Sequence, residues 1–320
     1  MKYIYILTSI IIILFLSTSY NNFYIVKKVL PENTLKKIKN NYPPHLRKKI
    51  GEMENLIKQK EDYISTYEKL IERYVEDYGK YFDENLRYSY LNDKKKIKCE
   101  QNIPIILIIG QSNAANNLQG HDDINNDQIN FFNQNCYNLK SPTLGATGEL
   151  FNIASGISNE LKNSKKFIFL TNAWGGTSID DWARDGSILT TYVNENLSFL
   201  NKNGNKLKYI IWIQGEKDFK NYNDYEIKFR KTIDNSLKDI ELDKNFKLFI
   251  TQTSICKHQE NNKLIRSKKL NNEQVKVGNN RDYFTLEITD NLDQTYRYDK
   301  CHFNQKGFNE ISKELVKYLN

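Results

Sequence analysis

The feature that most constrains the fold is an alternation of strand-like and helix-like segments that begins near Lys98. Short runs rich in β-branched and aromatic residues predict strands at 103–110, 166–173, 207–213, 246–253 and 282–288. Helix-like stretches lie between them, around 150–163, 188–202 and 222–239. This rhythm predicts a parallel sheet that is covered by helices on both faces.

The first predicted strand ends in small polar residues. Its apolar run is followed by "GQSN", which places Ser112 just after the strand. A run of β-branched residues is typical of a strand buried on both faces, and the catalytic groups of such sheets gather at the carboxyl ends of the strands. Ser112 is therefore placed where a nucleophile would be, although Gly-x-Ser turns after strands are common.

A nucleophilic serine needs a base, and His302 is the candidate. Asp299 stands three residues before it in "RYDKCHFNQKGF". On a turn, that spacing lets a carboxylate reach the imidazole Nδ1 and leave Nε2 free for the serine. A lone Asp-x-x-His is usually a surface or capping pair, but a serine on the first strand combined with this pair on the last loop favours a catalytic set. No G-x-S-x-G is present, which counts against the nucleophile elbow of α/β-hydrolases.

Charge and ligand spacing argue against two other classes of protein. The net charge is +8, but residues 27–98 hold 18 Lys or Arg and 12 Asp or Glu, so most of the basic excess lies in the N-terminal segment. We therefore expect no nucleic-acid groove in the C-terminal region. The four cysteines and four histidines show no C-x-x-C, H-E-x-x-H or H-x-H spacing, so we expect no metal site. Nucleophilic catalysis by a serine needs no cofactor, so we expect none.

Residues 3–20 are almost wholly apolar and follow Lys2. Their length is borderline between a secretory signal and a short transmembrane helix, and we favour an uncleaved anchor over a signal peptide for residues 1–25. The lysines that follow would place that side in the cytoplasm, which conflicts with an exported enzyme. We expect a membrane-anchored or secreted, extracytoplasmic protein, with the orientation left open.

Residues 26–98 form a second segment. After Pro31, Pro43 and Pro44, apolar residues recur between Ile50 and Tyr81 at alternating steps of three and four, which predicts a long helix. One reading is a coiled-coil stalk that makes a homo-oligomer through residues 50–81. The other is an amphipathic helix that packs on its own catalytic domain.

Five short motifs follow one another between residues 100 and 320: "GQSN", "GATGELF", "AWGGTSIDDW", "WIQGEKD" and "YDKCHFN". Together they resemble the SGNH/GDSL hydrolase superfamily, and most nearly its sialate O-acetylesterase-like carbohydrate esterases. The resemblance implies a flavodoxin-like three-layer α/β/α domain over residues 99–320. It also implies a serine esterase that removes acyl groups, chiefly acetyl, from an acylated glycan.

Carried over residue by residue, the resemblance implies roles for the motifs. Ser112 is the nucleophile, His302 the general base and Asp299 its orienting carboxylate. The backbone N–H groups of Ser112 and Gly148 would donate to the oxyanion. The Gln214 side chain would be the third donor, in place of the asparagine of many relatives. Three preorganised donors would stabilise the negative charge that develops on one oxygen of the tetrahedral intermediate.

A further set is expected to hold the nucleophile loop or to line the substrate site: Gln111, Asn113, Gly176, Thr177, Asp181, Trp182 and Glu216. Within it, the Trp182 ring is a candidate for stacking on a sugar. The alternatives are a tight strand-to-helix turn around Gly176 and a capping carboxylate at Glu216.

Two further questions stay open at this level. Cys256 and Cys301 flank the predicted active-site edge, where they would form a disulfide in an oxidising compartment or remain two buried thiols. The same catalytic set would also serve an O-acetyltransferase that acts on a glycan. A non-catalytic glycan-binding or assembly protein is the second alternative, and it would have no use for all three catalytic residues.

Overall fold

The computed structural model describes residues 94–122, 127–161, 165–220, 222–253, 255–257, 264–278 and 282–319. The predicted anchor at 1–25 and almost all of the predicted helical segment lie outside the described residues. The end of that segment belongs to the sheet, because Lys96–Ile97 form its first strand. Within the described ranges, no helix is long and apolar enough to cross a membrane.

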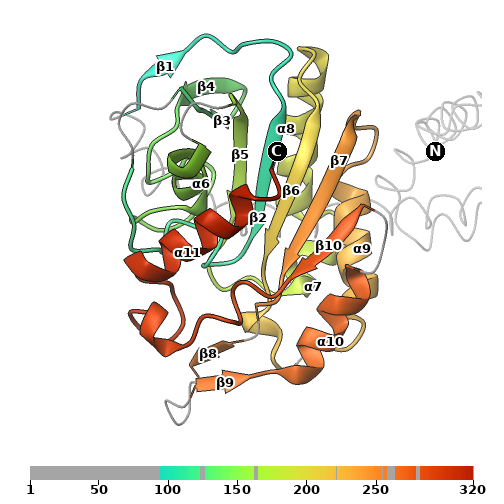
Figure 1. The fold of residues 1–320 in the computed structure, drawn as a ribbon. Helices are drawn as coiled ribbons and strands as arrows, with labels where there is room; N and C mark the ends of the chain where they lie inside the picture. Colours follow the sequence, from blue (N-terminus) through green and yellow to red (C-terminus); the bar gives the residue numbers. More distant parts are fainter. Residues whose placement is uncertain are drawn as a thin grey trace, which may run out of the picture. The chain divides into compact units, whose positions relative to one another are not determined.

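An eight-stranded sheet forms the centre of the described fold, in the order β1-β4-β3-β5-β2-β6-β7-β10 (Figure 1). Its strands are β1 (Lys96–Ile97), β2 (Ile105–Gly110), β3 (Ile129–Phe132), β4 (Asn135–Asn138), β5 (Ile168–Ala173), β6 (Leu207–Ile213), β7 (Leu242–Thr251) and β10 (Tyr283–Leu286). Along the sheet, the neighbours in β3-β5-β2-β6-β7-β10 pair in parallel. At the other edge, β4 pairs antiparallel with both β3 and β1. A separate antiparallel pair joins β8 (Ile255–Lys257) to β9 (Leu264–Arg266).

The order of the central strands matches the predicted fold class. Numbered along the chain, β5-β2-β6-β7-β10 follow the 2-1-3-4-5 order of flavodoxin-like folds. The three short strands β3, β4 and β1 extend this sheet on the β5 side. The prediction of a three-layer, mainly parallel α/β fold is confirmed.

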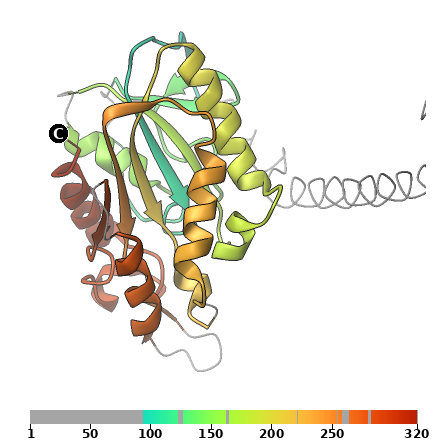
Figure 2. The same cartoon turned by 90° about the vertical axis from the view of Figure 1, so that its right-hand side faces the viewer.

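Helices cover both faces of the sheet, as Figure 2 shows from the side. Side chains of α6 (Ile153–Leu161) and α11 (Gln305–Val316) join one hydrophobic cluster. The other cluster takes its side chains from α7 (Ile179–Ala183), α8 (Ile188–Lys202), α9 (Tyr225–Ser236) and α10 (Lys268–Val277). Two short 3₁₀ turns, η2 (Glu216–Asp218) and η3 (Gln294–Tyr296), complete the described elements.

Strand β2 shows why this sequence needs helices on both sides. Ile105, Leu107 and Ile109 contribute to the cluster beneath α7 to α10. Ile106 and Ile108 contribute to the cluster beneath α6 and α11, and all five side chains are fully buried. Each buried side chain of this size stabilises the fold by about 1.5–3 kcal/mol relative to exposure. Exposing the side chains on either face of β2 to solvent would therefore cost several kcal/mol of stability.

The predicted elements agree with the structure except at their ends. The strand predicted at 246–253 begins earlier, at Leu242, and the helix predicted at 222–239 is shorter, as Tyr225–Ser236. The helix predicted at 188–202 has the bounds observed for α8. The structure adds elements that were not predicted: β1, β3, β4, β8, β9, α7, α10 and α11.

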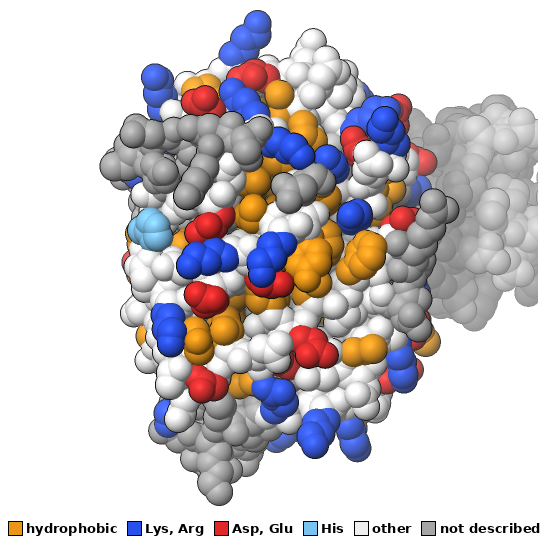
Figure 3. All heavy atoms as spheres, viewed as in Figure 1, with side chains coloured by type: hydrophobic (Ala, Val, Ile, Leu, Met, Phe, Trp, Pro, Cys, Tyr) orange, Lys and Arg blue, Asp and Glu red, His pale blue; other side chains and the backbone are white. Residues whose placement is uncertain are grey.

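The surface of the described fold carries charges of both signs. On the face in Figure 3, Lys and Arg side chains are interspersed with Asp and Glu, and apolar side chains lie between them. Neither sign gathers into one patch over the coloured part of this face.

Gly110 allows β2 to turn sharply toward Ser112, and we expect its replacement by alanine to destabilise the fold. Its φ is +142°, and an added Cβ would lie 2.0 Å from the carbonyl oxygen of Ile213. A backbone atom cannot yield as a flexible side chain does, so Gly110→Ala should lower the free energy of unfolding by about 3 kcal/mol or more. Urea unfolding measures the loss.

Gly176→Ala is the matched control. Gly176 also has a positive φ, +76°, but an added Cβ would have nothing within 4 Å. It should lose only about 1–2 kcal/mol, for the left-handed conformation. Equal losses in both variants would contradict the steric explanation at Gly110.

Candidate active site

The carboxyl ends of three adjacent strands meet at one place on the sheet. β2 lies between β5 and β6, and Gly110 is in register with Ala173 on one side and Ile213 on the other. Since the strand order reverses here, this is the switch point at which flavodoxin-like sheets bind ligands. The residues that follow the strands, Ser112 and Gln214 among them, are therefore neighbours.

Ser112 lies in a tight turn after β2. The Gln111 N–H donates to the Ile213 carbonyl at 3.0 Å, and the Ala115 N–H donates to the Ser112 carbonyl at 3.1 Å. The Ser112 Cβ lies 3.9 Å from the position that a Cβ on Gly175 would take. The turn thus holds Ser112 by its backbone beside a residue that has no side chain.

Asp299 and His302 form the pair that their spacing predicts. Asp299 Oδ2 lies 2.6 Å from His302 Nδ1, and Oδ1 accepts from the backbone N–H groups of His302 at 2.7 Å and Cys301 at 2.9 Å. Burial alone would raise the pKa of the Asp299 carboxyl, but the hydrogen bonds from His302 and Cys301 outweigh it and lower the pKa to about 2. Asp299 is therefore ionised at neutral pH, and Nδ1 of the imidazole is occupied.

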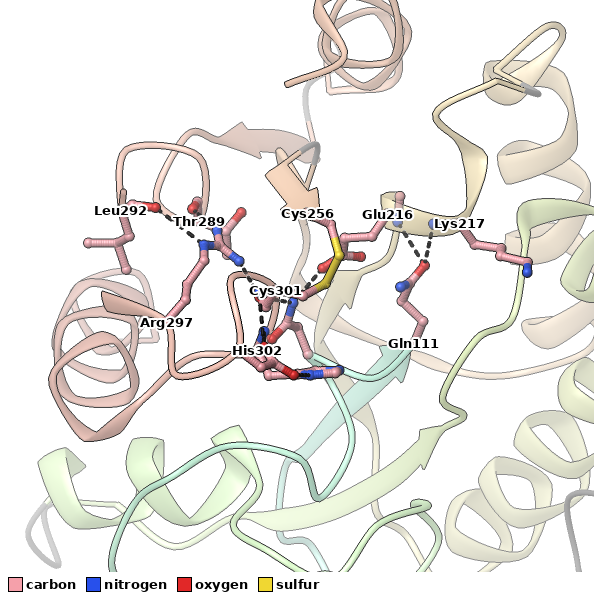
Figure 4. Close-up of a disulfide and its surroundings, with 12 residues drawn as sticks. Gln111, Glu216, Lys217, Cys256, Thr289, Leu292, Arg297, Cys301 and His302 are labelled. Atoms are coloured by element: carbon pink, nitrogen blue, oxygen red, sulfur yellow. Dashed lines mark hydrogen bonds and ion pairs between the residues drawn. A yellow bond between two sulfur atoms is a disulfide. The ribbon is translucent and has the colours of Figure 1, made fainter. Parts of the chain in front are cut away.

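The loop that carries this pair is held by a disulfide and by Arg297 close to His302, as Figure 4 shows. A disulfide joins Cys301 to Cys256, as the sequence allowed. The buried guanidinium of Arg297 donates to the carbonyls of Cys301, of Thr289 at 2.8 Å and of Leu292 at 3.4 Å. Three carbonyl acceptors and one disulfide thus fix the backbone immediately before His302.

Two contacts join the His302 loop to the Ser112 loop. Asn113 Nδ2 donates to the Cys301 carbonyl at 3.3 Å, and the Tyr298 hydroxyl donates to the Asn117 carbonyl at 3.0 Å. Asn117 Nδ2 in turn donates to the Ser112 carbonyl at 3.3 Å. The structure therefore brings the predicted nucleophile loop and the predicted base loop together at the same end of the sheet.

Gly148 lies against the loop that carries Ser112. A Cβ at this position would be 2.3 Å from the Asn116 carbonyl oxygen, which explains why the position has no side chain. The loop is held there by hydrogen bonds from the Leu150 N–H to the Asn116 carbonyl and from the Asn116 N–H to the Thr147 carbonyl, both at 2.8 Å.

Gln214 has a different environment from the one expected of an oxyanion donor. Its side chain is fully buried, and Nε2 donates to the Asp218 carboxylate and to the Thr177 carbonyl at 3.2 Å. Its Oε1 accepts from the Tyr225 hydroxyl at 2.9 Å. Because both amide hydrogens are engaged, the geometry gives Gln214 a role in a buried network and corrects the expectation of a third donor.

Asp218 is the charged member of this network. Burial raises the pKa of its carboxyl to about 6, against the hydrogen bonds from Gln214 and from the Ile179 N–H, the latter at 3.0 Å. The Ile179 contact ties the network to the start of α7. Gln214 and Asp218 thus join β6 to the helix that follows β5.

Trp182 corrects a second expectation, because its side chain is fully buried and cannot stack on a sugar. Its ring packs edge-on against Trp212 with centroids 5.3 Å apart, and Nε1 donates to Thr177 Oγ1 at 3.1 Å. Thr177 is equally buried, and Asp181 forms a capping box with Ser178 at the start of α7. Among Gly176, Thr177, Asp181 and Trp182, only Gly176 is exposed. Thr177, Asp181 and Trp182 therefore fit the alternative interpretation, a tight turn between β5 and α7.

Gln111 follows β2 and Glu216 follows β6, and each side chain contacts the loop at the end of the other strand (Figure 4). Gln111 Oε1 accepts from the backbone N–H groups of Lys217 at 3.2 Å and Gly215 at 3.4 Å. Glu216 is buried and accepts from Asn113 Nδ2 at 2.5 Å. Gln111 thus joins the Ser112 loop to the start of η2, and Glu216 contacts the same loop through Asn113.

Sequence reasoning missed Arg297 and Tyr298, which directly precede Asp299. The Tyr298 ring stacks on the His302 ring with centroids 5.9 Å apart and an interplanar angle of 24°, and its side chain is 41% exposed. The only signal was their place in "RYDKCH", next to the predicted pair.

The Asp299–His302 pair and the loop of Ser112 lie at the same end of the sheet, and a serine and an imidazole held by a carboxylate are residue types used in nucleophilic acyl transfer. Within the described parts of the chain, no cluster of three or more His, Cys, Asp or Glu side chains could hold a metal ion.

Solved structures resemble this fold at low identity. A protein from Arabidopsis thaliana is 16% identical with a TM-score of 0.55, over 68% of this chain and 97% of that one. The protein NanS is 15% identical with a TM-score of 0.47, over 69% of this chain and 98% of that one. An acetylxylan esterase from Geobacillus stearothermophilus is 10% identical with a TM-score of 0.44, over 70% and 97% of the two chains.

No curated protein matches the sequence. A sequence profile does match it: residues 102–320 fit the family described as "Carbohydrate esterase, sialic acid-specific acetylesterase". The match covers the whole described α/β domain from β2 onward, and it confirms the resemblance to the sialate O-acetylesterase-like branch. The chain therefore belongs to this family of carbohydrate esterases and is a carboxylic ester hydrolase.

Proposed function

We propose that this esterase removes acetyl groups from a carbohydrate through Ser112, His302 and Asp299. The observation that carries the proposal is the Asp299–His302 pair, in which the carboxylate holds Nδ1 at 2.6 Å and leaves Nε2 to face a substrate or nucleophile. Two hydrogen-bonded contacts join this loop to the loop of Ser112.

In the proposed reaction, Ser112 Oγ attacks the acetyl carbonyl and His302 Nε2 accepts its proton. The N–H groups of Ser112 and Gly148 donate to the oxyanion. His302 then returns the proton to the departing sugar hydroxyl, which leaves an acetyl-enzyme. A water molecule, activated by the same imidazole, releases acetate and restores Ser112.

Assays on the full chain in detergent test this function. Acetate release is measured first from p-nitrophenyl acetate and then from O-acetylated sugars, with O-acetylated sialic acid among them. We expect release from both classes. An inert, folded protein would contradict the proposal, and acetyl transfer to an added sugar acceptor would favour the transferase.

We also propose that Tyr298, and not Trp182, supplies the ring that stacks on the sugar, since it is exposed beside His302. Tyr298→Ala should lower kcat/KM for an acetylated glycan about tenfold more than for vinyl acetate, which has no ring to stack. The ratio of the two values cancels any effect on His302 that both substrates share. Tyr298→Phe, which keeps the ring, should preserve the ratio, and an unchanged ratio in Tyr298→Ala would contradict the stacking role.

Export and anchoring remain proposals about residues outside the described ranges. Two disulfides, Cys99–Cys136 and Cys256–Cys301, use all four cysteines of the chain and support an oxidising, extracytoplasmic location. Anchoring through residues 3–20 and self-association through residues 50–81 stay predictions.

A further inference from the structure

The carboxyl group of Glu216 faces the side-chain amide of Asn113, the residue next to Ser112. Asn113 Nδ2 donates to Glu216 Oε1 at 2.5 Å. Both residues are buried, with exposed fractions of 1% for Asn113 and 8% for Glu216. The amide and the carboxyl thus meet away from solvent, between the ends of β2 and β6.

Each of these two groups has one buried oxygen without a hydrogen-bond partner: the amide oxygen Oδ1 of Asn113 and the second carboxyl oxygen Oε2 of Glu216. Two such acceptors cost free energy when Glu216 is ionised, because neither can donate to the other. One proton on Glu216 Oε2 turns that oxygen into a donor, and the neighbouring amide oxygen is then its acceptor.

The charges around Glu216 do not pair with it directly. The cations that face it are Arg297 and, when protonated, His302. The Arg297 guanidinium donates to carbonyls, those of Cys301, Thr289 and Leu292. Burial therefore dominates and raises the pKa of Glu216 to about 7, although Asn113, the Glu216 backbone N–H, Arg297 and His302 all act to lower it.

We propose that Glu216 acts as a neutral acid, whose carboxyl and the Asn113 amide form a pair of hydrogen bonds that fixes the Ser112 loop against the His302 loop. The second bond of Asn113 Nδ2, to the Cys301 carbonyl at 3.3 Å, connects the pair to the base loop. Glu216 is thus a positioning residue, and this assignment rests on the proposed function. Ionisation would break one bond of the pair and place a negative charge near His302, which favours an imidazolium that cannot accept the serine proton.

Two variants distinguish an uncharged hydrogen-bonding partner for Asn113, in Glu216→Gln, from the loss of any partner, in Glu216→Ala. A glutamine amide can donate to Asn113 Oδ1 and accept from Nδ2, so E216Q should keep kcat close to wild type at pH 6. E216A loses both bonds and should lower kcat by about 10- to 100-fold, as expected for a misplaced catalytic group. As the pH rises through about 7, kcat of E216Q should increase relative to wild type, because only the wild-type pair ionises.

The pH dependence of stability tests the proton without using activity. Between the ordinary pKa of 4.5 and the folded value of about 7, the folded state holds a proton at Glu216 that the unfolded state has lost. The unfolding free energy of wild type should therefore fall relative to E216Q as the pH rises through this range, and the difference should level off above it. Asp218, whose pKa is also raised, contributes equally to both proteins.

Two results would overturn the proposal. One is a stability difference between wild type and E216Q that does not change from pH 4.5 to 7, because Glu216 would then be ionised throughout. The other is an E216Q as slow as E216A at pH 6, because the negative charge would then be required. If wild type hydrolyses no acetyl ester, the proposed function fails, while the stability measurement still decides whether Glu216 holds the proton. If E216A does not fold, the E216Q comparisons alone decide.

Discussion

Ser112→Ala should lower kcat for acetyl-ester hydrolysis by about 10⁴- to 10⁶-fold without unfolding the protein. The loss is large because no covalent intermediate can form, and the residues of a catalytic set act as a unit. The fold should survive because the turn is held by backbone groups, such as the Ala115 N–H on the Ser112 carbonyl at 3.1 Å. The residual rate is measured on acetylated sugar, and the melting temperature is measured in parallel.

Two controls make this result specific. A fluorophosphonate should add once to wild type, at Ser112, and not at all to Ser112→Ala, as intact-mass and peptide analysis would show. His302→Ala should be nearly as inactive as Ser112→Ala. His121→Ala should stay active, because His121 is exposed and contacts Gln305 outside the proposed catalytic set. A Ser112→Ala protein with near wild-type turnover would exclude the proposed nucleophile.

The helices and strands that could be predicted are those with a clear local sequence pattern. The continuous apolar run of β2 has no exposed face, so it indicates a doubly covered parallel strand before any partner is known. The β3–β4 hairpin carries no comparable signal. Asn133 and Gln134 at its turn both have positive φ, +45° and +59°, and Asn-Gln lacks the glycine by which such turns are usually recognised.

Within the site, local pairs were predictable and the burial of single residues was not. The three-residue spacing of Asp299 and His302 limits what the two side chains can reach, and they do meet. Trp182 is different, because its burial depends on Trp212, which lies far along the chain on another strand. Asp181, by contrast, stands in a Ser-x-x-Asp pattern that predicts the capping box seen in the structure.

The network around Glu216 and Gln214 shows why residue type alone misleads at such a site. Gln214 could serve an oxyanion as well as a carboxylate, and only the buried carboxylate of Asp218 decides between them. Glu216 would be a solvated anion at the surface, but burial against Asn113 raises the pKa of its carboxyl to about 7. Both outcomes depend on which residues are buried together in the folded protein, and this cannot be predicted from a single sequence.

Asp299→Asn should lower kcat by about 10³- to 10⁴-fold and leave the loop in place. An asparagine Oδ1 can still accept from the backbone N–H groups of Cys301 and His302, which lie 2.9 and 2.7 Å from the aspartate oxygen. Its amide nitrogen, however, would donate to Nδ1, which forces the proton onto Nε2 and removes the base. Asp299→Ala loses the backbone contacts as well, so it should also lower the melting temperature.

The dependence of stability and activity on pH in the acid range gives a second test of the Asp299 carboxylate. Because the pKa of Asp299 is lowered to about 2 from an ordinary value of 3.8, its ionised form contributes stability above pH 3.8 that is lost as the pH falls toward 2. Wild type should therefore lose more stability than Asp299→Asn between these values, and the activity of wild type above pH 4 should show no limb from this group. An Asp299→Asn enzyme with wild-type kcat would mean that the imidazole needs no carboxylate to present Nε2 to Ser112, and the catalytic set would reduce to a Ser112–His302 dyad.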